Sequence, residues 1–412
     1  FASGSNIAIG AYTLSELSTG GNYIAIGNSA LRSVTNNVSG TIAIGIGSMR
    51  MVTTASSGPN IGIGTNTLYR VSGADNIGVG YESMFNLLNG GDNISLGKNT
   101  LYTSKVSSRS IAIGSEALKN VRSSDNIAIG YYALRNLDSL ASDILPSDFS
   151  NIAIGNWSMT NATTATRSVA IGNRAMENTT TGGLNVAIGE KALYYNTTGS
   201  QNFAGGMNAL LSNTIGIKNV AVGPGSMEQN TTGSFNVGVG IDALLNNSTG
   251  SGNIGIGWNG FANNYTGSNN IGIGYGAGKS ITHGNNNVVI GREAGWVPGF
   301  QNDTMNSSII IGWGAYATED STVILGADLI KKTYLRGRLY NSTYGSGSVT
   351  GTAAYNLSVT SSGEIIETAL SGGTGTVTSV GTGYGLSGGT ITTTGTILVD
   401  SASLSNYYLR RK

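Results

Sequence analysis

The chain has no cysteine, a single histidine and four prolines among its 412 residues, and only 10% of its residues are charged. The absence of cysteine excludes disulfides and thiolate chemistry, so stability has to come from stacking and from partner chains. His283 alone cannot form a histidine-pair metal site, and a lone histidine argues against a catalytic triad. The net charge of +1 gives no electrostatic footprint for nucleic acid or for an anionic membrane. We therefore expect no nucleic-acid partner.

Long hydrophobic runs are also missing. No apolar stretch approaches the length of a membrane span, and no signal peptide opens the sequence, so we expect no membrane insertion. The chain starts at Phe1, inside a repeat pattern that is already running, which predicts a truncated or processed N-terminus. The many Gly-x-Gly pairs belong to the repeats, with no dinucleotide-binding fold behind them, and we expect no cofactor.

Glycine, in contrast, is abundant, at 64 of 412 residues, about twice its usual share. Nine of the glycines follow one another at steps of 17 residues, from Gly155 to Gly291. The series continues upstream to Gly10, with steps of 16 to 19 and one of 25, and downstream to Gly312 and Gly326. A short period held over this length decides the fold.

Each repeat opens with Asn, an apolar β-branched residue, a small residue, a second apolar residue and Gly, as in Asn185–Gly189. Apolar residues two positions apart indicate a short strand. Leu or Met comes four positions after the glycine, and a turn such as Asn-Thr-Thr-Gly at 196–199 follows. Such a unit buries its apolar side by stacking on copies of itself, with Val and Ile on one wall and Leu and Met on the other. We predict an all-β fold, a β-solenoid of about nineteen rungs and roughly 90 Å.

Two further positions in the repeat carry predictions. The asparagine that opens each repeat predicts a ladder of stacked amides, which supplies hydrogen bonds to a buried turn. The residue between the two apolar strand positions is Ala, Gly or Ser in sixteen repeats, from Ala8 to Gly272. We interpret it as an outward wall kept slim because other copies of the chain lie against it, which predicts a homo-oligomer. The alternative is a tight turn that excludes bulk on one face.

The repeat Asn/Ser-Val/Ile-Ala-Ile-Gly-x-x-Ala/Ser-Leu/Met resembles that of the β-roll heads of trimeric autotransporter adhesins, whose repeats are shorter. Over most of its length the chain is similar to bacteriophage tail-fibre proteins, in its longer repeat, in residues 351–367 and 373–397, and in the ending at 406–412. The resemblance implies a homotrimeric fibre of a virion or an extracellular surface. The partners it implies are further copies of the chain, other tail or fibre proteins, and a glycan or protein receptor on a cell surface.

Three segments are expected along the chain. A repeat β-solenoid or β-roll occupies 1–326, a neck with four basic residues occupies 327–345, and a β-rich trimeric stalk segment occupies 346–412. Residues 137–150 enlarge one turn by eight residues, and a loop that bulges from a rigid scaffold is a candidate for recognition. A neutral insertion is the alternative, because solenoid turns tolerate extra length.

Candidate recognition residues come from that turn and from a concentration of aromatic residues near the end of the repeats. Aromatic rings can stack on sugar faces, and carboxylates can accept hydrogen bonds from sugar hydroxyls. The candidates are Trp296, Trp313 and Tyr316, together with Asp143 and Asp148 in the enlarged turn. Packing at the end of the roll is the alternative for each ring, and it is the favoured interpretation of Trp313.

Motifs for catalysis are weak. Gly385–Gly389 matches a nucleophile elbow but has no later histidine, and Gly274–Ser280 resembles a phosphate loop that is one residue short. Aspartates at the spacing of calcium-binding rolls do not persist through the repeats, so we expect no metal. We expect a non-enzymatic fibre that binds a surface. The alternatives are a polysaccharide-degrading depolymerase on a β-solenoid and an ice-binding protein with a threonine array at 180–181, 197–198 and 231–232.

Overall fold

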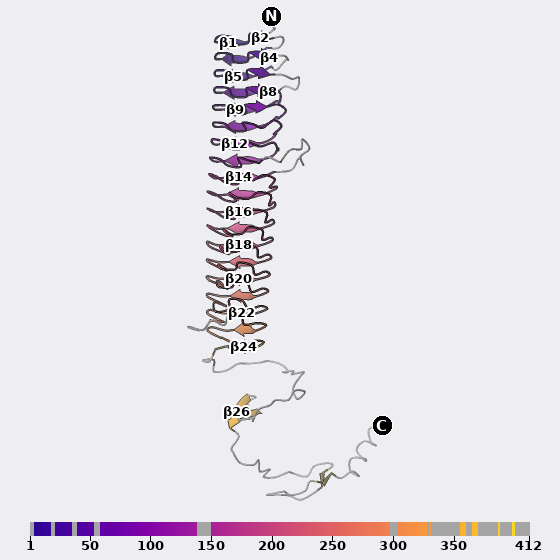
Figure 1. Ribbon diagram of the computed structural model, residues 1–412, viewed down its shortest axis with the longest axis vertical. Coiled ribbons are helices and arrows are strands. Elements are labelled where there is room, and N and C mark those ends of the chain that lie inside the picture. Colours follow the sequence, from indigo (N-terminus) through magenta and orange to yellow (C-terminus); the bar gives the residue numbers. More distant parts are fainter. Residues whose placement is uncertain are drawn as a thin grey trace, which may run out of the picture. The chain divides into compact units, whose positions relative to one another are not determined.

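The computed structural model of the chain contains an all-β solenoid whose rungs stack in sequence order (Figure 1). The structure describes residues 4–17, 21–34, 39–52, 58–137, 150–296, 304–327 and 330, and four short strands between 355 and 399. The chain forms two compact units, Phe1–Tyr334 and Leu335–Lys412, and the solenoid belongs to the first. Within these described residues, no helix is long and apolar enough to cross a membrane.

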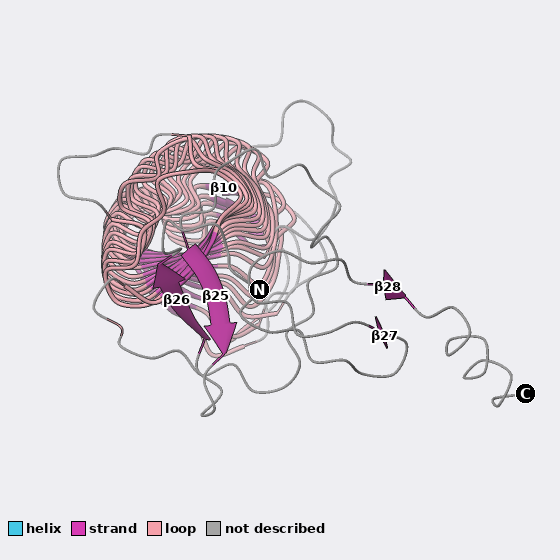
Figure 2. Ribbon diagram, turned by 90° about the horizontal axis from the view of Figure 1, so that it is seen from below, coloured by secondary structure: helices cyan, strands magenta, loops and turns pink. Residues whose placement is uncertain are grey.

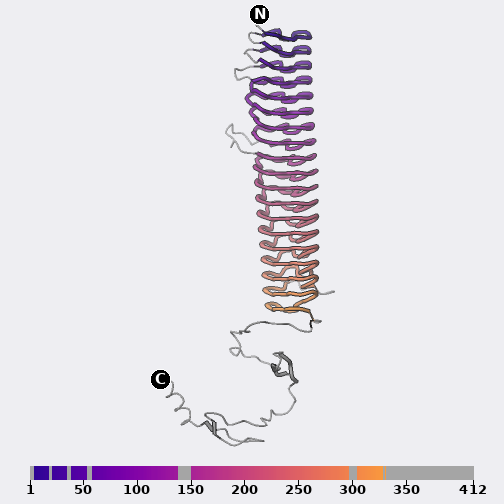
Figure 3. The backbone as a smooth tube through the Cα atoms, turned by 180° about the vertical axis from the view of Figure 1, so that it is seen from behind, coloured from indigo at the N-terminus to yellow at the C-terminus, as the bar shows by residue number. Residues whose placement is uncertain are grey.

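One strand from each rung joins a sheet of 19 parallel strands, which confirms the predicted β-solenoid. The strands pair without a change of register, so that Ile152 lies opposite Val169 and Val169 opposite Val186. The rungs superpose in a closed oval outline with the sheet on one side (Figure 2), and they follow one another at regular intervals (Figure 3). The strands of this sheet are β1 (Ile7–Ile9), β3 (Ile24–Ile26), β5 (Ile42–Ile44), β7 (Ile61–Ile63), β9 (Ile77–Val79), β11 (Ile94–Leu96), β12 (Ile111–Ile113), β13 (Ile127–Ile129), β14 (Ile152–Ile154), β15 (Val169–Ile171), β16 (Val186–Ile188), β17 (Phe203–Gly205), β18 (Val220–Val222), β19 (Val237–Val239), β20 (Ile254–Ile256), β21 (Ile271–Ile273), β22 (Val288–Ile290), β23 (Ile309–Ile311) and β24 (Val323–Leu325).

The repeating glycine ends each of these strands for a geometric reason. Gly189 has a φ of +138°, which L side chains rarely adopt. A Cβ at this position would lie 2.4 Å from the carbonyl oxygen of Gly206 in the next rung. Any other residue would therefore clash with the backbone of the neighbouring rung, and this contact explains why the glycine marks the period.

A second, smaller parallel sheet forms the opposite wall of the first five rungs. Its last residue in each strand points inward and is apolar, with Val34 and Leu87 fully buried. The strands, in spatial order, are β10 (Asn86–Leu87), β8 (Arg70–Val71), β6 (Met51–Val52), β4 (Ser33–Val34) and β2 (Glu16–Leu17). In the rungs of Gly189 to Gly257 the same inward position, seven residues after the rung glycine, is taken by asparagine, from Asn196 to Asn264.

The interior of the solenoid is lined by alanine and not by valine and isoleucine. Ala187 is fully buried at the centre of β16, whereas Ile188 beside it points outward and is 43% exposed. The predicted burial of the Val and Ile column, and the predicted outward alanine wall, are therefore wrong. The predicted Leu and Met column is inside, as Leu193 and Met176 show, both with no exposed surface.

The small residue is required because the interior is narrow. The Leu or Met of one rung fills the space against the central strand residue of the next rung. A Cβ on Gly255 would lie 2.8 Å from Leu244 Cγ, and one on Gly272 would lie 2.2 Å from Phe261 Cδ2. Close packing leaves no room for a second large side chain on the same level, so the large residue on one wall selects a small residue on the other.

Near the C-terminal end of the solenoid, large and small residues exchange walls. Gly278 and Gly295 stand where the earlier rungs have Leu or Met. The central strand residues there are Val289 and Ile310, and both are fully buried. A Cβ on Gly295 would meet Val289 Cγ1 at 3.1 Å, so the enlarged strand residue takes the space that Leu or Met fills elsewhere. The core therefore continues through these rungs.

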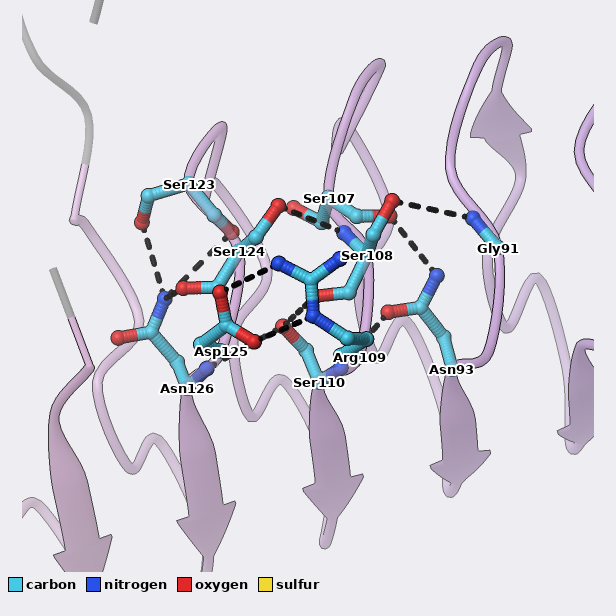
Figure 4. Close-up of polar contacts among 10 residues, drawn as sticks. All are labelled: Gly91, Asn93, Ser107, Ser108, Arg109, Ser110, Ser123, Ser124, Asp125 and Asn126. Carbon is cyan, nitrogen blue, oxygen red and sulfur yellow. Dashed lines mark hydrogen bonds and ion pairs between the residues drawn. The ribbon is translucent and has the colours of Figure 1, made fainter. Parts of the chain in front are cut away.

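The asparagine ladder predicted at the start of the repeats is confirmed. The backbone N–H of Asn202 donates to Asn185 Oδ1 at 2.9 Å, and Asn185 Nδ2 donates to the carbonyl oxygen of Gly199 at 2.8 Å. Most of its bonds join a side-chain amide to backbone, and direct amide–amide bonds occur only at some steps. Figure 4 shows the same backbone-to-side-chain bonds from the N–H of Ser110 to Asn93 Oδ1 and from the N–H of Asn126 to Ser110 Oγ, while Asn126 Nδ2 donates to Ser123 within its own turn. Each rung thus obtains partners for a buried N–H and a buried carbonyl.

A second ladder, which was not predicted from the sequence, runs beside the first, and the two share acceptors, since Asn185 Nδ2 and Asn196 Nδ2 both donate to the carbonyl oxygen of Gly199. It consists of the first asparagine of each turn, with amide–amide distances of 2.8–3.1 Å, and its members are Asn196, Asn213, Asn230, Asn247 and Asn264. All five side chains are fully buried. All of them except Asn213 open an Asn-x-Thr glycosylation sequon, and their burial makes these sequons part of the turn structure. The ladder ends where Ile281 takes the next position, and Asn264 Oδ1 has no hydrogen-bond partner there.

The second unit contributes two short antiparallel pairs. Strand β25 (Tyr355–Val359) pairs with β26 (Ile365–Ala369), and β27 (Leu386–Ser387) pairs with β28 (Leu398–Val399). The expected neck, except for residues 327 and 330, and most of the expected stalk at 346–412 lie outside the described residues.

Candidate recognition surfaces

The outer side of the 19-stranded sheet is an uncharged apolar surface, which we call the sheet face. It consists of the first and third residues of every strand, and each is Ile, Val, Leu or Phe except Gly205. These side chains are about one third exposed in the interior strands, with Val222 at 39% and Ile256 at 37%. Together they present on the order of 1,500–2,000 Å² of contiguous apolar surface, several times the largest patch of a typical soluble monomer.

Beside the sheet face lies the turn that follows each rung glycine, which we call the glycine corner. It comprises the residues one, two and five positions after the glycine. The second of these has a left-handed backbone in every regular rung, with φ of +54° at Lys191 and +53° at Asp242. Eight of the nine cation–π pairs in the described residues lie on this corner, and only the pair of Lys218 and Phe235 lies elsewhere.

In the N-terminal rungs the aromatic residues of this corner cover one another. Tyr69 stacks on Phe85 with ring centroids 4.9 Å apart, and Phe85 stacks on Tyr102 at 5.2 Å. Arg50 lies over Tyr69 and Lys119 lies over Tyr102, so both ends of the stack are closed by cations. Ring faces that are covered in this way cannot stack on a ligand, and we assign this column a structural role.

In the C-terminal rungs the glycine corner carries exposed rings. Trp258, Tyr275, Arg292 and Trp313 each stand one position after their rung glycine, and the exposed fractions of Trp258, Tyr275 and Trp313 are 53%, 43% and 65%. Trp258 and Tyr275 make an edge-to-face contact at 5.4 Å. Arg292 lies 5.4 Å from the centre of the Tyr275 ring. We call these four residues the aromatic strip.

The structure separates the residues that the sequence analysis proposed. Trp313 belongs to the aromatic strip, and its 65% exposure shows that the packing interpretation of this residue is wrong. Trp296 stands five positions after its glycine and is half-buried under Lys279, whose Nζ is 5.7 Å from the ring centre. Tyr316 is 42% exposed. Asp143 and Asp148 lie outside the described residues.

Three residues of the strip were not predicted from the sequence: Trp258, Tyr275 and Arg292. The sequence contains a pattern that could have identified them, because these residues are 17 positions apart and occupy the same place in three successive repeats. No family model matches the chain, and neither does any curated protein. The sheet face and the aromatic strip are therefore the two surfaces from which a function can be argued.

Some charged groups outside these surfaces interact in pairs. Arg109 and Asp125, on neighbouring rungs, make two contacts of 2.7 Å, shown in Figure 4. The hydrogen bond from Arg109 holds the pKa of Asp125 below its ordinary value. Burial, and to a smaller extent the carboxylate of Asp242, raise the pKa of Glu228. In the part of the chain that the structure describes, no three His, Cys, Asp or Glu side chains gather closely enough to hold a metal ion.

The threonines of the turns are used within the solenoid. The hydroxyl groups of Thr180, Thr197 and Thr214 each donate to a carbonyl oxygen of the next rung at 3.0 Å. The second threonine of each turn is exposed, but Ile215 interrupts that column. Half of the proposed ice-binding array is therefore bonded to backbone, which argues against that alternative.

Proposed function

We propose that the chain is a structural fibre protein of a phage tail or cell surface, that its solenoids associate as a homotrimer, and that the fibre attaches to a surface by non-covalent recognition, with a glycan as the receptor. The sheet face is the observation that carries the proposal. The role is one of assembly and binding, and no catalytic step belongs to it.

The size and composition of the sheet face support self-association. Soluble monomers rarely expose contiguous apolar patches larger than a few hundred Å², and a stable interface buries about 800 Å² per partner. The sheet face exceeds both values, and across its described strands it includes no charged side chain. Its rows repeat at the rung spacing of roughly 4.8 Å, so a second copy in parallel orientation presents rows of the same spacing. That the assembly contains three copies is taken from the resemblance to trimeric fibre proteins.

The position of this interface corrects the argument made from sequence. The alanine column cannot meet another chain because it is inside the solenoid, with Ala187 and Ala221 fully buried. The residues that face outward are the valines and isoleucines of the same strands. The expectation of a homo-oligomer therefore rests on the exposed valine and isoleucine side chains and no longer on the small alanine side chains.

Charge substitutions on two sides of the solenoid test the proposal. Lysine at Val222 and Ile256 would place cations in the interface, whereas lysine at Thr198 and Thr232 would place the same charges on exposed turns. We expect the native mass of the wild type to be three times 42.1 kDa, about 126 kDa, and the Val222→Lys/Ile256→Lys variant to dissociate. The Thr198→Lys/Thr232→Lys variant should keep the wild-type mass. A monomeric wild type, or dissociation caused equally by both variants, would overturn the proposal.

A further inference from the structure

We propose that the aromatic strip, Trp258, Tyr275, Arg292 and Trp313, binds a neutral oligosaccharide that lies parallel to the axis of the solenoid. The inference rests on the proposed function, because it assigns the place and the chemical class of the ligand through which the fibre attaches. It differs from the assembly proposal in the surface and in the side chains used.

The four residues are held in one line by backbone hydrogen bonds between rungs. The carbonyl oxygen of Trp258 accepts from the N–H of Gly276 at 3.0 Å, and that of Tyr275 accepts from Glu293 at 2.7 Å. The carbonyl oxygen of Arg292 accepts in the same way from Gly314 at 3.0 Å. Three rung steps of about 4.8 Å separate the first residue from the last, so the strip spans roughly 14 Å. This length suits several linked sugars better than one.

The space beside the rings is open. Glycine occupies the next position after Tyr275 and after Trp313, where other rungs carry side chains such as Lys191 and Asp242. A Cβ on Gly314 would have no atom within 4 Å, and one on Gly276 would meet only Glu293 Cγ at 3.8 Å. Ligand atoms can therefore approach these rings from the side. The stacked column of the N-terminal rungs offers no such access.

The polar groups of the strip suit hydroxyls. Arg292 lies 3.5 Å from Glu293 Oε1, and the Arg292 side chain is 66% exposed. Side by side, a guanidinium offers donors and a carboxylate offers acceptors, and each sugar hydroxyl both donates and accepts. An anionic ligand would meet Glu293, and a cationic one would meet Arg292. The paired charges therefore favour a neutral ligand, while the exposed rings of Trp258 and Trp313 supply apolar faces for the C–H faces of the sugars.

The experiment measures binding to an array of neutral, sialylated and sulfated oligosaccharides by wild-type protein and four variants. Trp258→Ala and Trp313→Ala each remove one ring. Gly314→Asn fills the open space with a residue that Asn208 and Asn259 show to be compatible with this left-handed backbone. Trp157→Ala is the matched control, because Trp157 stands two positions after its rung glycine, outside the strip, and is half-buried beside Arg174. The native mass of every variant is measured alongside.

We expect wild-type protein to bind neutral members of the array, and each of the three strip variants to lose about tenfold or more in affinity, with Trp157→Ala unchanged. Failure to bind any neutral oligosaccharide, or binding only to charged ones, would overturn the assignment. So would dissociation of the assembly by the Trp258→Ala and Trp313→Ala variants, because the strip would then be part of the interface between chains. A wild type that binds sugars as a monomer would refute the assembly and leave the strip standing.

Discussion

Asn219 allows a quantitative test of the asparagine ladder. Its Nδ2 donates to the carbonyl oxygen of Gly233 at 2.8 Å, and its Oδ1 accepts from the backbone N–H of Asn236 at 3.0 Å. Both asparagines are fully buried. The Asn219→Ala substitution leaves the N–H of Asn236 without a partner, whereas the carbonyl oxygen of Gly233 keeps its second bond, from Asn230 Nδ2 at 3.1 Å. A buried polar group without a partner costs about 1–3 kcal/mol, so the loss should be about 1–3 kcal/mol.

Serine at the same place should cost less, because the solenoid already uses it there. Ser168 occupies the equivalent position, and its Oγ accepts from the backbone N–H of Asn185 at 3.2 Å. The Asn219→Ser variant should therefore keep the acceptor and lose only one of the two donors to Gly233, at about 0.5–1.5 kcal/mol. The half-buried Asn246, which makes a single side-chain bond to Asn263 at 3.2 Å, provides the control substitution Asn246→Ala.

Hydrogen exchange of individual amides measures the effect where it occurs. The N–H groups of Val220 and Val237 bond to the neighbouring rungs at 2.8 Å and report opening at this site. Because 1.4 kcal/mol corresponds to a factor of ten, their protection should fall by roughly one to two orders of magnitude in the alanine variant, and by less in the serine variant. Ile152, four rungs away, should keep its protection, since rungs of a solenoid interact mainly with their neighbours. Equal protection in all variants, or a uniform loss along the solenoid, would refute this reasoning.

Three further predictions concern the core, the left-handed turns and pH. Gly272→Ala should lower the free energy of unfolding, measured with denaturant, by about 1–3 kcal/mol because the new Cβ would meet Phe261. Adding Phe261→Leu should recover much of this loss. Additive effects of the two substitutions would contradict the matching of a large residue on one wall with a small residue on the other. Lys191→Val should destabilise by about 1 kcal/mol or more, because a β-branched residue tolerates a φ of +54° poorly, whereas Lys191→Asn should be neutral; equal effects would exclude backbone strain as the cause. The pKa of Glu228 is raised in the folded state. Its contribution to the free energy of unfolding is therefore most favourable below the ordinary glutamate pKa and is lost as the pH rises through the pKa of the folded state. Glu228→Gln should therefore raise the melting temperature at neutral pH and give no gain in acid; a gain that is the same at both pH values would rule out ionisation as its origin.

The sequence predicted the period, the strands, the glycine that ends them, the Leu and Met column and the first asparagine ladder, because each follows from a residue type that recurs every 17 positions. The side on which each strand residue lies was wrong. An alternation of Ile, Ala and Ile is compatible with either face inside, since none of these residues is polar. The deciding fact is the width of the interior, which depends on contacts between rungs. The pairing of large with small residues at Phe261 and Gly272, and at Val289 and Gly295, records that width.

Candidate recognition residues were harder to predict, because a cluster in sequence is not a cluster in a solenoid. Trp296 and Trp313 are 17 residues apart but differ in their distance from the rung glycine, so they stand on different columns. Trp258 and Trp313 are farther apart in sequence and share one column. Placing each aromatic residue by its position after the glycine would have found the strip. The covering of the Trp296 ring by Lys279 depends on side-chain contacts that the repeat does not specify.

The location of the interface between chains can be measured directly with spin labels. The chain has no cysteine, so a single engineered cysteine can be labelled at Ile256 on the sheet face or at Thr198 on an exposed turn. We predict an immobilised label with strong dipolar coupling between copies at position 256, and a mobile, uncoupled label at position 198. Equally mobile and uncoupled labels at the two positions would show that the sheet face is in contact with solvent, which would contradict the proposed fibre.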